Sequence, residues 1–158
     1  MDRFLGRHAK RIDAKGRVSI PATFRSVLAR DGYEGVFALR SLTVPAIEAG
    51  GHALIGDIDQ LLAGYDPFSE AYQSLSIALL GGGDTLSLDA EGRIVVPDWM
   101  RAATGATDEL VFVGQGSKFQ IWSPERFTQA EAEARRQATE LIRARGNQPG
   151  SATVVTGA

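Results

Sequence analysis

The stretch DAKGRVSIP at Asp13–Pro21 returns 76 residues later as DAEGRIVVP at Asp89–Pro97. Both copies place an acid, a glycine, an arginine, apolar residues and a proline at the same spacing. A repeat of this length indicates an internal duplication, so the fold is predicted to consist of two similar units.

Each copy has the chemistry of a tight turn that leads into a strand. The side chains of Asp13 and Asp89 can accept hydrogen bonds from the backbone just ahead, and Gly16 and Gly92 tolerate positive φ. Apolar residues then alternate along a short strand. The proline cannot donate to a sheet but suits the first turn of a helix. Each repeat is therefore predicted to run strand, DxxGR turn, strand, helix.

The composition of the 158 residues is that of an ordinary soluble globular chain. No apolar run approaches the roughly 20 residues that span a bilayer, and residues 1–4 lead into basic residues without the apolar stretch of a signal peptide. The chain has no cysteine, which excludes disulfides, thiolate metal sites and cysteine nucleophiles. We expect a cytoplasmic protein that has no membrane partner.

The net charge of −2 conceals a strong asymmetry between the two ends of the chain. Residues 1–30 contain eight Lys or Arg against two Asp, a net charge of +6, which leaves −8 for the rest. A local basic patch of this kind is typical of a nucleic-acid surface. The alternative is a solvated basic face that has no partner.

The remaining patterns divide the chain into consecutive segments. Strands are predicted at residues 35–40 and 42–44, and two helices at 52–64 and 67–80, the second capped by Asp66. The predicted organisation is repeat one at 7–51, a helical hairpin connector at 52–82, repeat two at 83–126, a C-terminal helix at 124–145 and a disordered tail at 146–158.

With these duplicated turns, the sequence resembles the MraZ family of bacterial transcriptional regulators, which have two SpoVT/AbrB-like repeats. Leu79-Leu80-Gly81 before the second turn, and Val113-Gly114-Gln115 and Lys118–Trp122 after it, add to the likeness. It covers nearly all of residues 1–145. The resemblance implies a mainly β fold with added helices, in which the repeats interlace into a pseudo-twofold, double-split β-barrel.

The resemblance also implies a function. Family members are cytoplasmic, nucleoid-associated proteins that assemble into ring-like homo-oligomers. They bind short direct repeats in double-stranded DNA upstream of the cell-division and cell-wall gene cluster, usually as repressors.

Two departures stand out in this sequence. Lys15 of the first turn is replaced by Glu91 in the second, and residues 42–51 lack the aromatic, proline-bounded passage often found in the family.

The arginines of the two turns are the main candidates for DNA recognition. A guanidinium at a turn can bind guanine O6 and N7 or a phosphate, or it can close its own turn as an ion pair with the aspartate. We favour DNA for Arg17, which has basic neighbours, and the ion pair for Arg93, which stands beside Glu91. The predicted phosphate contacts are Lys10, Arg11, Lys15, Arg3 and Arg7.

Catalytic and cofactor chemistry find little support in the sequence. His8 and His52 are the only histidines, and residues 114–118 lack the full spacing of a phosphate-binding loop. We predict a sequence-specific DNA-binding regulator with no enzymatic activity, cofactor, metal or small-molecule substrate. The alternatives are an AbrB-type antitoxin and a non-enzymatic oligomeric scaffold protein.

Overall fold

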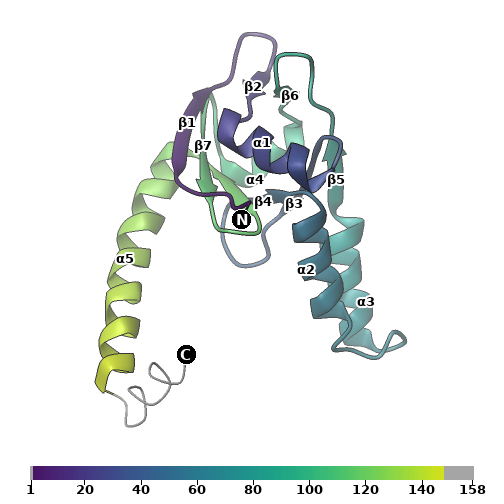
Figure 1. Cartoon of the computed structure of the whole chain (residues 1–158), viewed down its shortest axis with the longest axis vertical. Coiled ribbons are helices and arrows are strands. Elements are labelled where there is room, and N and C mark those ends of the chain that lie inside the picture. The colour runs from purple at the N-terminus through teal and green to yellow at the C-terminus, as the bar shows by residue number, and fades with distance from the viewer. Residues whose placement is uncertain (1, 148–158) are drawn as a thin grey trace. The chain divides into compact units, whose positions relative to one another are not determined.

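The computed structural model describes residues 2–147, and its elements repeat in order (Figure 1). The first repeat contains β1 (Arg7–Arg11), β2 (Arg17–Ser19), α1 (Ala22–Asp31), β3 (Val36–Arg40) and β4 (Ile47–Gly50). The second contains β5 (Gly83–Leu86), β6 (Arg93–Val95), α4 (Asp98–Thr104), β7 (Glu109–Gly114) and β8 (Phe119–Trp122). Between them lie α2 (His52–Leu62), α3 (Glu70–Ser76) and the π-helix η1 (Ile77–Gly81), and α5 (Pro124–Asn147) follows.

The strands of the two repeats interlace. One sheet has the order β1-β7-β8-β4-β3-β5, and β2 pairs with β6 in a second. Strand β1 pairs with β7 as β5 pairs with β3, while β4 pairs with its counterpart β8. This pairing has the symmetry of a pseudo-twofold axis. The predicted mainly β fold with added helices is confirmed, and the described strands form these two sheets without closing into one hydrogen-bonded cylinder.

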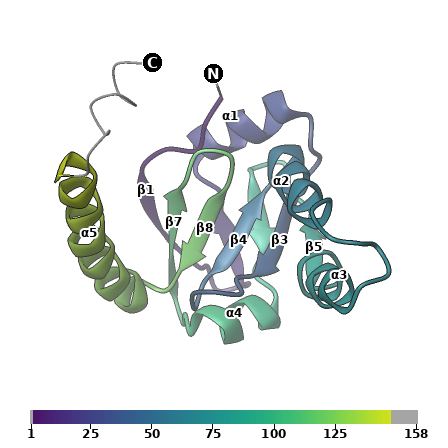
Figure 2. The same ribbon diagram turned by 90° about the horizontal axis from the view of Figure 1, so that it is seen from below.

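The main core lies between the strands and the two short helices (Figure 2). Phe24 of α1 and Met100 of α4 are completely buried. The ring of Phe24 lies 4.9 Å from that of Phe119 and 5.3 Å from that of Phe4, measured between centroids. Val18 and Ile94, which face each other across the β2–β6 pair, belong to the same core. The apolar residues after each DxxGR turn therefore anchor both turns to the body of the protein.

The helical hairpin packs on the face of β3 that points away from the main core. Val36 and Ala38 belong to the main core, whereas Phe37 and Leu39 contact Leu54, Ile58, Leu62 and Leu79 of the hairpin. Helix α3 begins at Glu70, three residues later than predicted, because Ser69 and not Asp66 caps it, accepting a 3.1 Å hydrogen bond from the Tyr72 amide.

The predicted strand at residues 42–44 is wrong, and the strand forms instead at Ile47–Gly50. The hydroxyl of Ser41 accepts hydrogen bonds from the amides of Thr43 and Val44, both at 3.3 Å. The Ser41 amide in turn donates to the Ala46 carbonyl at 3.0 Å. These local bonds turn the chain before it can extend.

The chain divides after Pro124 into two compact units, and α5 makes up the described part of the second. Its exposed side chains pair along the helix, with Arg136 bonded to Glu133 at 2.5 Å and to Glu140 at 3.1 Å. The helix includes Gly146 and Asn147, which the sequence placed in the tail. The rest of the predicted tail, 148–158, lies outside the described residues.

Candidate nucleic-acid interface

Asp13 organises the first DxxGR turn by itself. One carboxylate oxygen accepts hydrogen bonds from the amides of Lys15 at 2.9 Å and Arg17 at 2.8 Å, and the other accepts one from Arg17 Nε at 2.8 Å. Gly16 completes the turn with a φ of +79°, which favours glycine. The hydrogen bond from the Arg17 amide is the main cause that holds the pKa of Asp13 below its ordinary value; burial opposes it, and the Arg17 guanidinium and the Lys15 amide add to the lowering.

The second turn repeats this geometry atom for atom. Asp89 accepts from the amides of Glu91 and Arg93 at 2.9 Å each, and from Arg93 Nε at 2.8 Å. Gly92 has a φ of +77°. The pKa of Asp89 is lowered chiefly by the Arg93 amide, and the hydrogen bond to Asp89 raises the pKa of Arg93. The internal ion pair that we favoured for Arg93 is thus present in both turns.

The two turns lie side by side at one end of the first unit (Figure 1). Strands β2 and β6 pair with Arg17 opposite Val95 and Ser19 opposite Arg93. Two reciprocal backbone bonds join the repeats, from the Ile20 amide to the Gly92 carbonyl at 3.0 Å and from the Val96 amide to the Gly16 carbonyl at 2.8 Å. The negative charge of Asp13 also contributes to the raised pKa of Arg93. The turns therefore form one surface, which we call the turn surface (residues 13–17 and 89–93).

One position makes the two halves of the turn surface electrostatically different. In the second turn, Arg93 Nη2 bonds the Glu91 carboxylate at 3.2 Å. In the first turn Lys15 stands at that position, and within residues 2–147 neither the terminal nitrogens of Arg17 nor the ammonium of Lys15 makes a hydrogen bond. Asp13, Lys15 and Arg17 thus give the first turn a net charge of +1, whereas Asp89, Glu91 and Arg93 give the second turn a net charge of −1.

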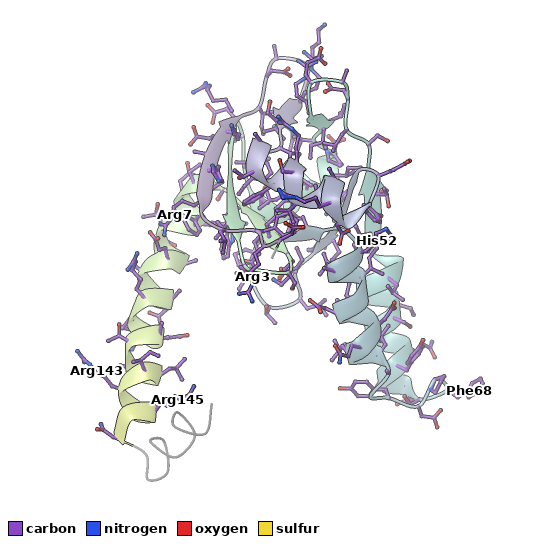
Figure 3. All side chains as sticks on the ribbon, viewed as in Figure 1. Arg3, Arg7, His52, Phe68, Arg143 and Arg145 are labelled. Carbon is purple, nitrogen blue, oxygen red and sulfur yellow. The ribbon has the colours of Figure 1, made fainter. Side chains whose placement is uncertain are left out.

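The other predicted contacts are spread along β1 and the N-terminal segment. The pleat of β1 exposes Arg7 and Arg11 and leaves Lys10 half-buried. Arg11 pairs with Asp108 at 3.7 Å, and both side chains are largely exposed. Figure 3 shows Arg3 and Arg7 away from the turn surface, and Arg7 lies about 13 Å along β1 from Arg11. The structure therefore gathers Arg17, Lys15 and Arg93 and does not bring all seven predicted residues together.

Known proteins match this sequence along almost its whole length. Residues 79–146 match the family model described as "MraZ protein, putative antitoxin-like". The protein named transcriptional regulator MraZ in Xanthobacter autotrophicus is 50% identical over 147 residues, which cover 93% of this chain and 94% of that protein. The chain belongs to the MraZ family. Proteins of the same name in Beijerinckia indica and Azorhizobium caulinodans are 47% and 44% identical, over 94% and 99% of this chain and 91% and 100% of theirs.

Family membership agrees with the prediction made from the duplicated turns, which is confirmed. The first of these relatives also matches along almost its whole length, so the comparison includes both repeats of the MraZ fold. Of the described helices, none is both long and apolar enough to cross a membrane. Among residues 2–147, no three His, Asp or Glu side chains are grouped so that they could hold a metal ion.

Two arginines beside the turn surface were missed in the sequence. Arg25 of α1 lies against Gly92 of the second turn, and Arg101 of α4 lies near Gly16 of the first. Each follows the arginine of its own DxxGR turn by eight residues, so the repeat itself carried a signal that could have found them. Their contacts are with the turn of the other repeat, which a local pattern does not show.

Proposed function

We propose that this MraZ family member is a sequence-specific, non-enzymatic DNA-binding transcriptional regulator that acts in the cytoplasm at the nucleoid. Its operator consists of short direct repeats upstream of the cell-division and cell-wall gene cluster, and it represses transcription there. The observation that best supports this proposal is the turn surface, in which two DxxGR turns share one face and, among the described residues, the ammonium of Lys15 and the outer nitrogens of Arg17 make no hydrogen bond.

Arg17 is suited to base or phosphate recognition because its side chain is already fixed. Asp13 holds Nε, and the side chain is only 28% exposed. A guanidinium held in this way loses little conformational freedom on binding. Its two remaining nitrogens match a bidentate acceptor such as guanine O6 and N7 or a phosphate. Arg17 therefore serves as the specific contact, and Asp13 as the residue that aims it.

The other cations supply affinity more than sequence information. Lys15 binds a phosphate next to the first turn, and Lys10 and Arg11 extend the contact along β1. Arg3 and Arg7 bind phosphates farther from the turns. Arg93 contributes less than Arg17, because Glu91 competes with DNA for its terminal nitrogen. Each neutralised phosphate steepens the dependence of log affinity on log salt by about 0.9.

The proposal includes assembly into a ring-like homo-oligomer, since repeated half-sites in DNA then meet repeated subunits and weak contacts add. Exposed apolar side chains are available for contacts between subunits. Phe68 at the hairpin tip is 97% exposed, and Ile77 and Leu42 are more than half exposed (Figure 3 labels Phe68).

A salt-titrated binding assay tests the proposal, using a duplex from the region upstream of the protein's own gene and a scrambled duplex of equal length. We expect selective binding with a steep salt slope. Arg17→Ala should abolish the selectivity, Arg93→Ala should weaken it less, and both variants should keep the oligomeric mass of the wild type. Binding without selectivity at every salt concentration would favour the scaffold alternative, and unchanged affinity in Arg17→Ala would refute the assignment of the site.

A further inference from the structure

The side chain of Arg25 links the helix of the first repeat to the DNA-binding turn of the second. A methyl group added to Gly92 would overlap Arg25 Cδ and would lie 2.6 Å from Nε and 2.7 Å from Cζ, so the side chain packs directly on the glycine. Arg25 Nη1 donates a 2.7 Å hydrogen bond to the carbonyl of Ile20. The amide of Ile20 donates to the carbonyl of Gly92 at 3.0 Å, which closes the link between the repeats.

The pseudo-symmetric arginine makes a looser contact. Arg101 Nη1 donates to the carbonyl of Thr107 at 2.7 Å, and a methyl group added to Gly16 would be 3.9 Å from Arg101 Nη2. The backbone bond from Val96 to Gly16 is nevertheless kept. The backbone links between the turns are therefore symmetric, whereas only the second turn is covered by an arginine from the other repeat. It is also the turn in which Glu91 replaces the lysine.

We propose that Arg25 is a positioning residue for DNA binding: it holds the second turn beside the first by packing on Gly92 and bonding Ile20. This inference rests on the proposed function, because it concerns the same turn surface. The physical reason is that a contact surface on two turns binds one ligand only if both are held in a fixed relation. A turn that is already held also loses less conformational freedom when DNA binds.

The first test is Arg25→Met, which keeps most of the apolar stem but lacks Nη1 and the charge, with Arg101→Met as the matched control. We expect the Ile20 amide of the DNA-free full-length protein to exchange its hydrogen several-fold faster in Arg25→Met and at the wild-type rate in Arg101→Met. Affinity for the upstream duplex should fall by up to about tenfold in Arg25→Met, because a turn that the lost hydrogen bond no longer holds must be ordered when DNA binds. The salt slope should stay unchanged, because no phosphate contact is lost.

The second test compares Gly92→Ala with Gly16→Ala. The two glycines have nearly the same positive φ, so the backbone strain of the substitution is matched. Only the methyl group at position 92 displaces Arg25. We expect the loss of DNA affinity caused by Gly92→Ala to be smaller in the Arg25→Met background than in the wild type, and the loss caused by Gly16→Ala to be the same in both backgrounds.

Two results would overturn the positioning role. One is a wild-type exchange rate for Ile20 in Arg25→Met, which can be measured even if the protein binds no operator. The other is a salt slope reduced by about 0.9 in that variant, which would make Arg25 a direct phosphate contact. Failure of the wild type to select the upstream duplex would instead refute the proposed function, while the exchange measurement would still decide whether Arg25 holds the second turn.

Discussion

Glu91→Lys should turn the second half of the turn surface into a copy of the first. In the wild type the Glu91 carboxylate, whose side chain is 67% exposed, bonds Arg93 Nη2 at 3.2 Å. The substitution removes that bond and places a lysine where Lys15 stands in the first turn. Because Asp89 still holds Nε and organises the turn through the backbone amides, we expect the fold and the thermal midpoint to change little.

The size of the effect on DNA follows from the number of phosphates contacted. One new lysine–phosphate contact steepens the salt dependence by about 0.9 on a log–log scale, which is about a 3.5-fold greater loss of affinity over a fourfold rise in salt. At low salt the variant should bind DNA more tightly than the wild type. Fluorescence anisotropy on the upstream duplex across a salt series measures both quantities.

Two further variants control the experiment. Glu91→Gln removes the charge without adding a lysine, so it should strengthen binding without the full change in slope. Lys15→Glu makes the first turn resemble the second and should weaken binding more than any change at position 91 strengthens it. If affinity and salt slope are the same in wild type, Glu91→Lys and Lys15→Glu, the turn surface does not contact DNA and the reasoning is refuted.

Two other predictions concern stability. The pKa values of Asp13 and Asp89 are lowered in the folded protein, so their stabilising effect is fully present above the ordinary aspartate pKa of 3.8 and is lost as pH falls below it. Urea unfolding between pH 3 and 6 should therefore show a weaker loss of stability with acid in Asp13→Asn than in the wild type. Phe24→Ala should cost about 3–5 kcal/mol of unfolding free energy because Phe24 is completely buried, whereas Phe68→Ala, at a 97% exposed position, should change it by less than about 0.5 kcal/mol. Chemical denaturation measures both, and an equal loss in the two variants would contradict the described packing.

The sequence predicted well what depends on local chemistry. The proline after each DxxGR strand immediately precedes α1 and α4, as the repeat predicted. The prediction of a strand at residues 42–44 was wrong although its residues suit a strand. The amides of Thr43 and Val44 donate to the hydroxyl of Ser41 and are therefore not available to a neighbouring strand. Competition between side-chain and sheet hydrogen bonds is decided by tertiary context, which alternation alone does not contain.

The candidate site was only partly predictable for a similar reason. Each aspartate and glycine acts within its own turn, so spacing was sufficient to find them. The side-by-side arrangement of the turns depends on bonds between residues more than 70 positions apart, such as Ile20 with Gly92. The packing of Arg25 on Gly92 likewise joins residues that are far apart in the sequence. A sequence shows which residues could act, and here the interlaced strands decide which of them meet.

The central claim is that the turn surface is where DNA binds, and hydrogen–deuterium exchange of the full chain with and without the upstream duplex tests it most directly. We predict that DNA slows exchange at residues 13–17 and 89–93, more strongly in the first segment, and leaves the hairpin tip around Phe68 unchanged. Protection confined to the hairpin or to α5, with both turns exchanging as in the free protein, would contradict the account.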